Sequence, residues 1–345
     1  MDLPTAIRTV MEGRSLARAD METVMRTIMT GEATDAQIGG FLIGLHMKGE
    51  TVAEIAAAAS VMRELAMRVE APTAHLVDTC GTGGDAQGTF NVSTATAFVV
   101  AAVGGRVAKH GNRSVSSASG SADVLEAAGA NIDLGPDAVA ACLREVGVGF
   151  LFAPYHHSAM RHAVGPRREM GVRTLFNLLG PLTNPAGAPN QLLGVFGTDW
   201  VGPVAETLKT LGSERVMVVH SADGLDEISI GASTHVAELR DGVIHEYAIQ
   251  PGDFGLTPAD LASVRASDVN ESLALMRSAF GGEPGPAADI LALNAGAAIH
   301  VAGLVDGLGE GVQRARAALA DGSVQQRLDE FVAVTQRLGQ QGAEA

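Results

Sequence analysis

The sequence predicts an α/β protein that consists of a small helical N-terminal domain and a larger α/β domain with a mostly parallel central sheet. Residues 1–70 carry apolar side chains at the three- and four-residue spacing of helices. From Leu76 onward, short apolar runs typical of strands alternate with helical stretches, which is the pattern of βα units. We therefore expect domains at 1–70 and 71–345, with about 157–183 joining the helical domain.

The expected elements follow in order along the chain. Helices are predicted over 19–30, 36–48 and 52–67, separated by breaks at Gly31 and Gly49-Glu50. Strands are predicted at 76–80, 106–110, 150–154, 192–197 and 215–220. Residues 235–249 are typical of an antiparallel hairpin that turns at Asp241-Gly242, and helices return after about Pro258. The ends of several parallel strands should therefore meet along one edge of a sheet, where ligands bind in such folds.

Composition and charge argue against several classes of function. The 345 residues include 24 basic and 39 acidic side chains, so the formal net charge is −15. Such a surface repels phosphate backbones, and we expect no nucleic-acid partner. Cys80 and Cys142 form no CxxC pair, and the densest apolar run, 95–103, is too short to span a bilayer. We expect a cytoplasmic protein without a membrane partner, in which local donors hold any anionic ligand.

The stretch DTCGTGGDAQGTFNVST, residues 78–94, is the first candidate site. Its glycines can bring backbone N–H groups close to a ligand, and Asn91 to Thr94 open a predicted helix. Asn, Ser and Thr cap such a helix start, whose dipole attracts anions. A tight turn with an ordinary N-cap is the alternative. A Walker A loop is excluded because its lysine is missing, and a dinucleotide fingerprint is disfavoured because no acidic residue follows at about 20 positions.

Two further segments also follow predicted strands. KHGNRSVSSASGSAD, residues 109–123, concentrates Lys109, Arg113 and several serines, which are the donors that a polyphosphate needs. HSADGLDEIS, residues 220–229, places Asp223, Asp226 and Glu227 close together, and we expect these carboxylates to be exposed. An acidic surface turn is the alternative reading. Beside a bound phosphate, however, such carboxylates favour Mg²⁺.

The motifs GTGGD, NVST, KHGNR and DGLDE, in this order, resemble those of the anthranilate phosphoribosyltransferases, the tryptophan-pathway family of the nucleoside phosphorylase-like glycosyltransferases. GFLIGLHMKGETVAEIAAAASVMREL and RREMGVRTLFNLLGPLTNP are also similar to that family. The resemblance implies a helical domain plus an α/β domain, and a homodimer formed through the helical domains. It implies Mg²⁺-dependent transfer of the phosphoribosyl group from 5-phosphoribosyl 1-diphosphate to the amine of anthranilate.

The resemblance also implies the residues of each subsite. The phosphoribosyl diphosphate would contact Gly81, Gly84, Asp85, Thr89, Asn91, Val92, Ser93, Thr94, Lys109, His110, Gly111, Asn112, Arg113, Ser114, Val115, Ser116, Ser117 and Ser121. Anthranilate would contact Gly81, Asn112 and Arg167, and magnesium would be held by Ser93, Asp226 and Glu227. Lys109 and His110 would act in catalysis, His110 either as proton acceptor or by positioning the anthranilate ring.

Several alternatives stay open at this point. Arg167 and Arg168 lie in a predicted helix at 159–170, where a solvated face competes with a role for Arg167 as clamp of the anthranilate carboxylate. Tyr155 and Ser158 stand where the family more often has small residues or proline, which leaves the width of the anthranilate access open. Packing of this helix on the N-terminal domain indicates a hinge that closes over both substrates.

Two rival functions are a pyrimidine nucleoside phosphorylase and a nucleic-acid-binding relative. The lysine-serine-serine phosphate motif of the phosphorylase is absent. The nucleic-acid-binding relative needs a basic surface, whereas this chain carries a strong negative charge.

Overall fold

The computed structural model describes residues 1–114 and 119–344, with side chains up to Gln341. Its N-terminal part contains α1 (Leu3–Met11), α2 (Arg18–Met29), α3 (Asp35–Lys48) and α4 (Val52–Leu65). Thr34 and Thr51 begin α3 and α4 with capping boxes, which explains why the chain turns helical there. α1 is a further helix that the apolar spacing did not single out. Asp2 caps α1, and a proline occupies its first turn.

A seven-stranded sheet follows, in the order β3-β2-β1-β4-β5-β6-β7. The parallel strands are β1 (Leu76–Gly81), β2 (Arg106–Gly111), β3 (Val148–Phe152), β4 (Asn190–Gly194) and β5 (Arg215–Ser221). β6 (Thr234–Arg240) and β7 (Val243–Ile249) form the expected antiparallel hairpin. Its turn lies at Asp241 and Gly242, whose φ angles of 52° and 75° are those of the predicted tight turn.

Two strands begin earlier than the apolar pattern predicted. β3 starts at Val148 and β4 at Asn190, because these residues pair in register with Val107 and Val77. Asn190 is polar, but its side-chain amide donates to the Leu76 carbonyl oxygen at 2.8 Å, so a buried strand tolerates it.

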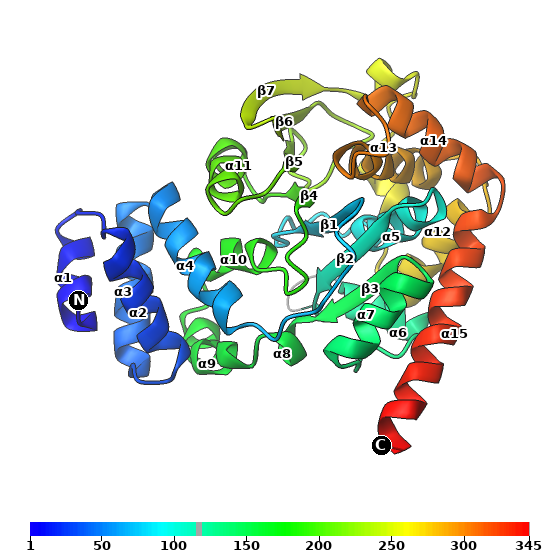
Figure 1. Ribbon diagram of the computed structural model, residues 1–345. Coiled ribbons are helices and arrows are strands. Elements are labelled where there is room, and N and C mark those ends of the chain that lie inside the picture. Colours follow the sequence, from blue (N-terminus) through cyan, green and yellow to red (C-terminus); the bar gives the residue numbers. More distant parts are fainter. Residues whose placement is uncertain (115–118, 345) are drawn as a thin grey trace.

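Helices cover both faces of the sheet (Figure 1). The helices that follow β1 in the described chain are α5 (Val92–Ala102), α6 (Ser121–Ala127), α7 (Pro136–Glu145), α8 (Ala153–His156), α9 (Arg161–Met170), α10 (Leu175–Leu179), α11 (Val201–Thr210), α12 (Val269–Phe280), α13 (Pro286–Val301), α14 (Leu308–Ala320) and α15 (Ser323–Glu344), and among them α9 and α10 pack on the bundle. In the described part of the chain, none of the helices is both long and apolar enough to cross a membrane.

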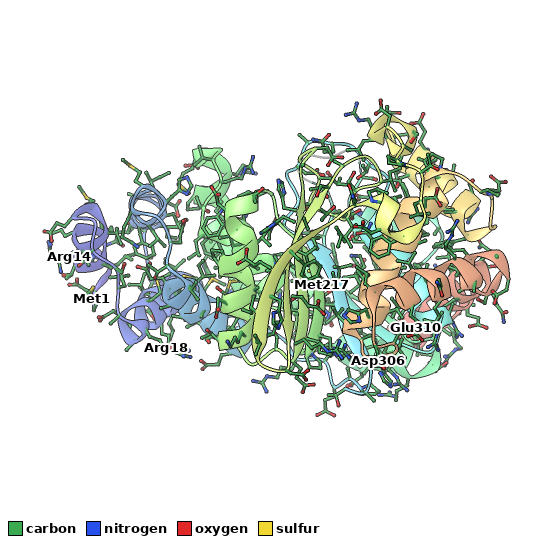
Figure 2. All side chains as sticks on the ribbon, turned by 90° about the horizontal axis from the view of Figure 1, so that it is seen from above. Met1, Arg14, Arg18, Met217, Asp306 and Glu310 are labelled. Atoms are coloured by element: carbon green, nitrogen blue, oxygen red, sulfur yellow. The ribbon has the colours of Figure 1, made fainter. Side chains whose placement is uncertain are left out.

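The sheet separates two hydrophobic cores. Alternate side chains of the central strands, such as Met217 and Val218 of β5, belong to different cores. The first core packs the sheet against α5–α7 and α12–α15. The second core continues from β4–β6 through α9–α11 into the bundle α1–α4. The bundle forms one end of the molecule, where Figure 2 labels Met1, Arg14 and Arg18, while Met217 lies centrally and Asp306 and Glu310 lie toward the other end.

The segment after β3 returns to the helical bundle. α9 packs against α2 and α3, and α10 packs against α3 and α4, although both follow the third strand in sequence. This packing supports a helical domain made of 1–70 together with about 157–183, and these boundaries stay our proposal.

Candidate active site

The glycine loop after β1 and the acidic segment after β5 lie in contact at the carboxyl edge of the sheet. The Gly83 N–H donates to Asp226 Oδ2 at 2.8 Å. A Cβ on Gly81 would lie 2.5 Å from the same oxygen, and a Cβ on Gly194 would lie 1.4 Å from the Asp226 carbonyl oxygen. Gly194 admits no side chain because the Asp226 backbone occupies the space, and a side chain at Gly81 would displace the Asp226 carboxylate, so the acidic segment lies directly on β1 and β4.

The N-terminus of α5 faces this acidic segment. Asn91 occupies the N-cap position of α5, as expected, but its side chain makes no capping hydrogen bond, so that part of the prediction is wrong. With φ −71° and ψ 68°, Asn91 is instead the centre of an inverse γ-turn, in which the Val92 N–H donates to the Phe90 carbonyl. The Ser93 N–H donates to Glu227 Oε1 at 3.1 Å, so a distant carboxylate satisfies one of the free donors of the first turn.

Lys109 lies buried beside the start of α5. Its Nζ donates to the Thr79 carbonyl oxygen and to Ser93 Oγ, the latter at 3.2 Å. Burial lowers the pKa of Lys109, while the charges of Asp78, Glu227 and others oppose this shift. The Lys109 ammonium group is thus held at the start of α5, the helix end that Glu227 also contacts.

Asp226 and Glu227 are not the exposed acids that their sequence position indicated. Asp226 is 9% exposed, and Glu227 Oε2 is buried without a hydrogen-bond partner among the described residues. Burial, and then the charge of Asp85, raise the pKa of Asp226 to about 7. Burial, and then Asp226 and Asp85, raise the pKa of Glu227 well above its usual value. The carboxylates are therefore crowded together without a sufficient counter-charge.

A divalent cation fits this arrangement of acids. Glu227 Oε2 has no hydrogen-bond partner among the described residues and can therefore serve as a metal ligand. The Ser93 hydroxyl, at the start of α5, accepts a hydrogen bond from Lys109 and is a second candidate ligand. The described residues contain no group of three or more His, Cys, Asp and Glu side chains that could hold a metal alone. Magnesium bound here would take its other ligands from phosphate oxygens and water, as it commonly does.

In the second loop, the Arg113 guanidinium already has acidic partners. It forms ion pairs with Asp123, at 3.3 Å, and with Glu126, and the hydrogen bonds that it donates to Glu126 raise its pKa. About half of its side chain is exposed. A role of Arg113 in binding the donor stays a prediction and would require exchange of these partners.

The rest of this loop is closed onto the start of α6. The Asn112 carbonyl accepts hydrogen bonds from the Ala122 N–H, at 3.2 Å, and from Ser121 Oγ, at 3.3 Å. The Ser114 N–H donates to Asp123 Oδ2 at 3.0 Å. These bonds bring the two ends of the loop together. The predicted donor-binding residues Val115, Ser116 and Ser117 lie outside the described residues.

A segment near the C-terminal helices holds the glycine loop. The Phe90 N–H donates to the Val264 carbonyl at 2.9 Å, and the Ala266 N–H donates to the Gly88 carbonyl at 2.8 Å. Arg265 pairs with Thr89 in an isolated β-bridge. The sequence offered no signal for these partners because they lie more than 170 residues away along the chain and bond through the backbone.

His110 is buried and neutral. Because the Gly180 carbonyl can only accept, His110 donates Nδ1–H to it at 3.1 Å, and Nε2 carries the lone pair. Burial, and then the neighbouring His157, lower the pKa of His110 to about 3. The two imidazole rings lie 4.9 Å apart, and burial lowers the pKa of His157 to about 4. Uncharged rings at this position can contact an aromatic ligand.

Arg167 lies on α9 and contacts α10, the helix that leads to Gly180. Its guanidinium lies 5.2 Å over the ring of Phe176 in α10, and burial lowers its pKa. α10 ends next to Gly180, whose carbonyl binds His110. Arg168, by contrast, is exposed. Burial is the one cause of the lowered pKa of Arg167, and no charged partner among the described residues contributes to it, so the guanidinium can receive a carboxylate.

Two of the cavities in the surface lie away from these residues. One, of about 440 Å³, lies beside the β6–β7 hairpin, and one, of about 400 Å³, lies at the amino ends of β4 and β5. Neither contains a predicted site residue. The candidate site is therefore defined by the convergence of strand ends and not by the size of a cavity.

The helical part and the α/β part of the chain each match a domain of one class of protein, the glycosyl transferases. The helical bundle domain of the glycosyl transferase family matches residues 4–66, and its a/b domain matches residues 73–325.

Individual proteins similar to this chain identify one family within the glycosyl transferases. The chain is 66% identical over 338 residues to the anthranilate phosphoribosyltransferase of Alkalilimnicola ehrlichii, covering 98% of this chain and 100% of the relative. It is 61% identical to that of Halorhodospira halophila, covering 99% and 100%. The crystal structure of the Thermus thermophilus anthranilate phosphoribosyltransferase is similar with a TM-score of 0.91 and 44% identity, covering 96% and 99%. The chain belongs to the anthranilate phosphoribosyltransferase family.

A yeast structure has the same fold. The Saccharomyces cerevisiae anthranilate phosphoribosyltransferase in complex with phosphoribosyl diphosphate and Mg superposes with a TM-score of 0.87 at 24% identity, covering 97% of this chain and 98% of the other.

Proposed function

We propose that this chain transfers the 5-phosphoribosyl group from 5-phosphoribosyl 1-diphosphate to the amine of anthranilate, as a step of tryptophan biosynthesis. The products are N-(5-phosphoribosyl)anthranilate and diphosphate. The observation that carries the proposal is the meeting of four features at one sheet edge: the glycine loop, the α5 N-terminus, buried Lys109 and the acidic pair Asp226–Glu227. Each feature suits a part of the diphosphate donor.

The reaction needs stabilisation of its leaving group above all. When the bond between ribose C1 and the diphosphate oxygen breaks, its electron pair goes to the diphosphate and positive charge develops on the sugar. Lys109 can hold the developing negative charge, since its Nζ has three protons and two hydrogen bonds to the chain. The N–H groups of the glycine loop and of the α5 start can serve as further donors.

Magnesium would be held by Asp226, Glu227 and the Ser93 hydroxyl. When bound, it would supply positive charge to the diphosphate oxygens. The raised pKa values of the two carboxyls support this assignment because a cation between them would relieve their crowding. The yeast relative that was solved with Mg is consistent with it.

Anthranilate would bind between Arg167 and His110. Arg167 would pair with its carboxylate through two parallel hydrogen bonds, and the neutral rings of His110 and His157 would contact its aromatic ring. The amine lone pair forms the new bond to C1, after which the nitrogen releases one proton. A pKa of about 3 makes His110 a weak base, which supports a positioning role over that of proton acceptor.

We also propose a cytoplasmic homodimer formed through the helical domains. Met11 and Met47 are the most exposed of the large apolar side chains described, at 73% and 83%. α1 and α3 run parallel, since Gly40 faces Ile7 and Gly44 faces Val10, so both methionines lie at the same end of the helix pair. An exposed apolar surface of this kind fits a subunit contact.

The function is tested by the loss of anthranilate fluorescence. Purified protein should consume anthranilate only when phosphoribosyl diphosphate and magnesium are both present, because leaving-group charge must be neutralised. EDTA should stop the reaction, and added magnesium should restore it. An undiminished rate in EDTA, or no consumption under any condition, would contradict the proposal.

A further inference from the structure

Asn91 holds two loops together at the candidate site. Its backbone forms the inverse γ-turn before α5, and its side chain is not used as a helix cap. Instead, the side chain reaches the second loop, where Asn91 Nδ2 donates to the Ser119 carbonyl oxygen at 3.2 Å. Ser119 Oγ donates back to Asn91 Oδ1 at 2.8 Å. The amide thus connects the glycine loop to the end of the serine-rich loop.

A third segment orients this amide. Ser272 of α12 accepts a hydrogen bond from the Asn91 backbone N–H at 3.1 Å and donates its own proton to Asn91 Oδ1 at 2.7 Å. Ser272 is completely buried. It is 181 residues from Asn91 in sequence, and Asp268 begins its helix by accepting from two backbone N–H groups.

The direction of every proton in this network is determined by chemistry. The Ser119 carbonyl can only accept, so the amide nitrogen of Asn91 must face it and the amide oxygen must face the two hydroxyls. The Asn91 backbone N–H can only donate, so the Ser272 hydroxyl must accept it and is left with one proton, which goes to Oδ1. A network with these directions stabilises one orientation of the amide.

We propose that Ser272 is a positioning residue for the phosphoribosyl donor site and acts through Asn91. It touches no reacting atom in this proposal, which rests on the function given above. α12 also packs against α6, the helix that follows the serine-rich loop. Ser272 therefore holds the start of α5 and the end of that loop at the spacing that the donor's phosphates require.

The test compares the kinetics of variants on one helix. Ser272→Ala should raise the KM for phosphoribosyl diphosphate about five- to thirtyfold, because two buried hydrogen bonds to Asn91 are lost. The KM for anthranilate should change less than twofold. Ser278→Ala is the matched control on α12, because Ser278 bonds to Glu283 and not to the loop. Ser272→Thr, which keeps the hydroxyl, should restore most of the donor affinity.

A double-mutant cycle with Asn91→Ala separates positioning from a general packing effect. If Ser272 acts through the Asn91 side chain, Ser272→Ala should raise the donor KM clearly less in the Asn91→Ala background than in wild type, because there only the hydrogen bond to the backbone N–H of residue 91 is left to lose. An additive effect, or a normal donor KM in Ser272→Ala, would overturn the inference. Ser272→Cys keeps the side-chain volume and gives the same test if the alanine variant does not fold. An inactive wild-type protein would instead refute the proposed function, so the two failures are distinguishable.

Discussion

At the scale of single residues, the Asp226 carboxyl accepts from the Gly83 N–H and faces Asp85 in a buried position. Its folded pKa of about 7 lies above its ordinary value of 3.8. The folded state therefore keeps the Asp226 proton over a pH range in which the unfolded chain has lost it. The associated stability is fully present below pH 3.8 and is lost as the pH rises to about 7.

Asp226→Asn should consequently stabilise the metal-free protein at pH 8 while it abolishes most activity. The asparagine amide resembles the protonated acid, since it can accept from Gly83 and donate to Asp85. We expect the free energy of unfolding to rise by about 2–4 kcal/mol relative to wild type at pH 8, with little difference near pH 4. Urea unfolding in EDTA at both pH values measures this, and an equal effect at both would contradict it.

Glu227→Gln, combined with Asp226→Asn, should cut turnover strongly. Burial and mutual repulsion make the ionised forms of both carboxyls unfavourable in the folded protein. The uncharged double variant should therefore have at least the free energy of unfolding of wild type in EDTA. A magnesium titration of its activity checks the assignment, and near-normal turnover would mean that the metal binds elsewhere.

Arg167→Ala should weaken anthranilate binding more than binding of the phosphoribosyl donor. Loss of a charge-assisted bidentate pair costs about 1.5–3 kcal/mol, which corresponds to a rise of about tenfold to a hundredfold in the KM for anthranilate. Arg168→Ala is the control, because Arg168 is exposed on the same helix. Steady-state kinetics with each substrate varied gives the comparison. Equal losses for both substrates, or a larger defect in Arg168→Ala, would assign the carboxylate to another residue.

At the scale of secondary-structure elements, the end of β4 determines where the acidic segment can lie. A Cβ at Gly194 would overlap the Asp226 backbone, so Gly194→Ala should displace the segment and lower magnesium-dependent activity at least tenfold. Gly197→Ala is the control, since its Cβ would make only an ordinary 3.8 Å contact with Trp200. Activity across a magnesium series distinguishes the two variants, and similar profiles would refute this role of β4.

Elements with strong local patterns were predictable from the sequence. The strands, the Asp241-Gly242 turn and the bundle helices α2, α3 and α4 follow from apolar spacing and turn chemistry, and each is present within a few residues of its predicted position, whereas α1 was not predicted. The site was predictable only as motifs at strand ends. The partners of Asn91 were not, because its local sequence favours a helix cap, whereas Ser272 and Ser119 offer a tertiary alternative.

Burial was the other property that local sequence could not give. Asp226 and Glu227 belong to a polar segment typical of a surface turn. This segment nevertheless packs directly against the sheet, because Gly81 and Gly194 have no side chain that would prevent the contact. The glycines are visible in the sequence, but the close approach that requires them depends on which strands are neighbours.

At the scale of the whole molecule, the paired ends of α1 and α3 present Met11 and Met47 to solvent. Met11→Glu together with Met47→Glu should shift the protein toward monomers, because two charges would have to be desolvated in the contact. Analytical ultracentrifugation measures the subunit mass of wild type and variant. Met67→Glu, outside this helix pair and 44% exposed in wild type, is the control. A monomeric wild type, or an unchanged double variant, would rule out this contact.

The second core joins the bundle to the sheet without interruption, through α10 and α11. A wide swing of the bundle away from the sheet would expose these apolar side chains to water, at a cost that grows with the area uncovered. We therefore expect substrate capture to involve small movements that keep α10 and α11 packed, and the hinge that the sequence indicated stays a prediction. On this expectation, entry of anthranilate and release of product depend on how far neighbouring helices shift while they stay in contact.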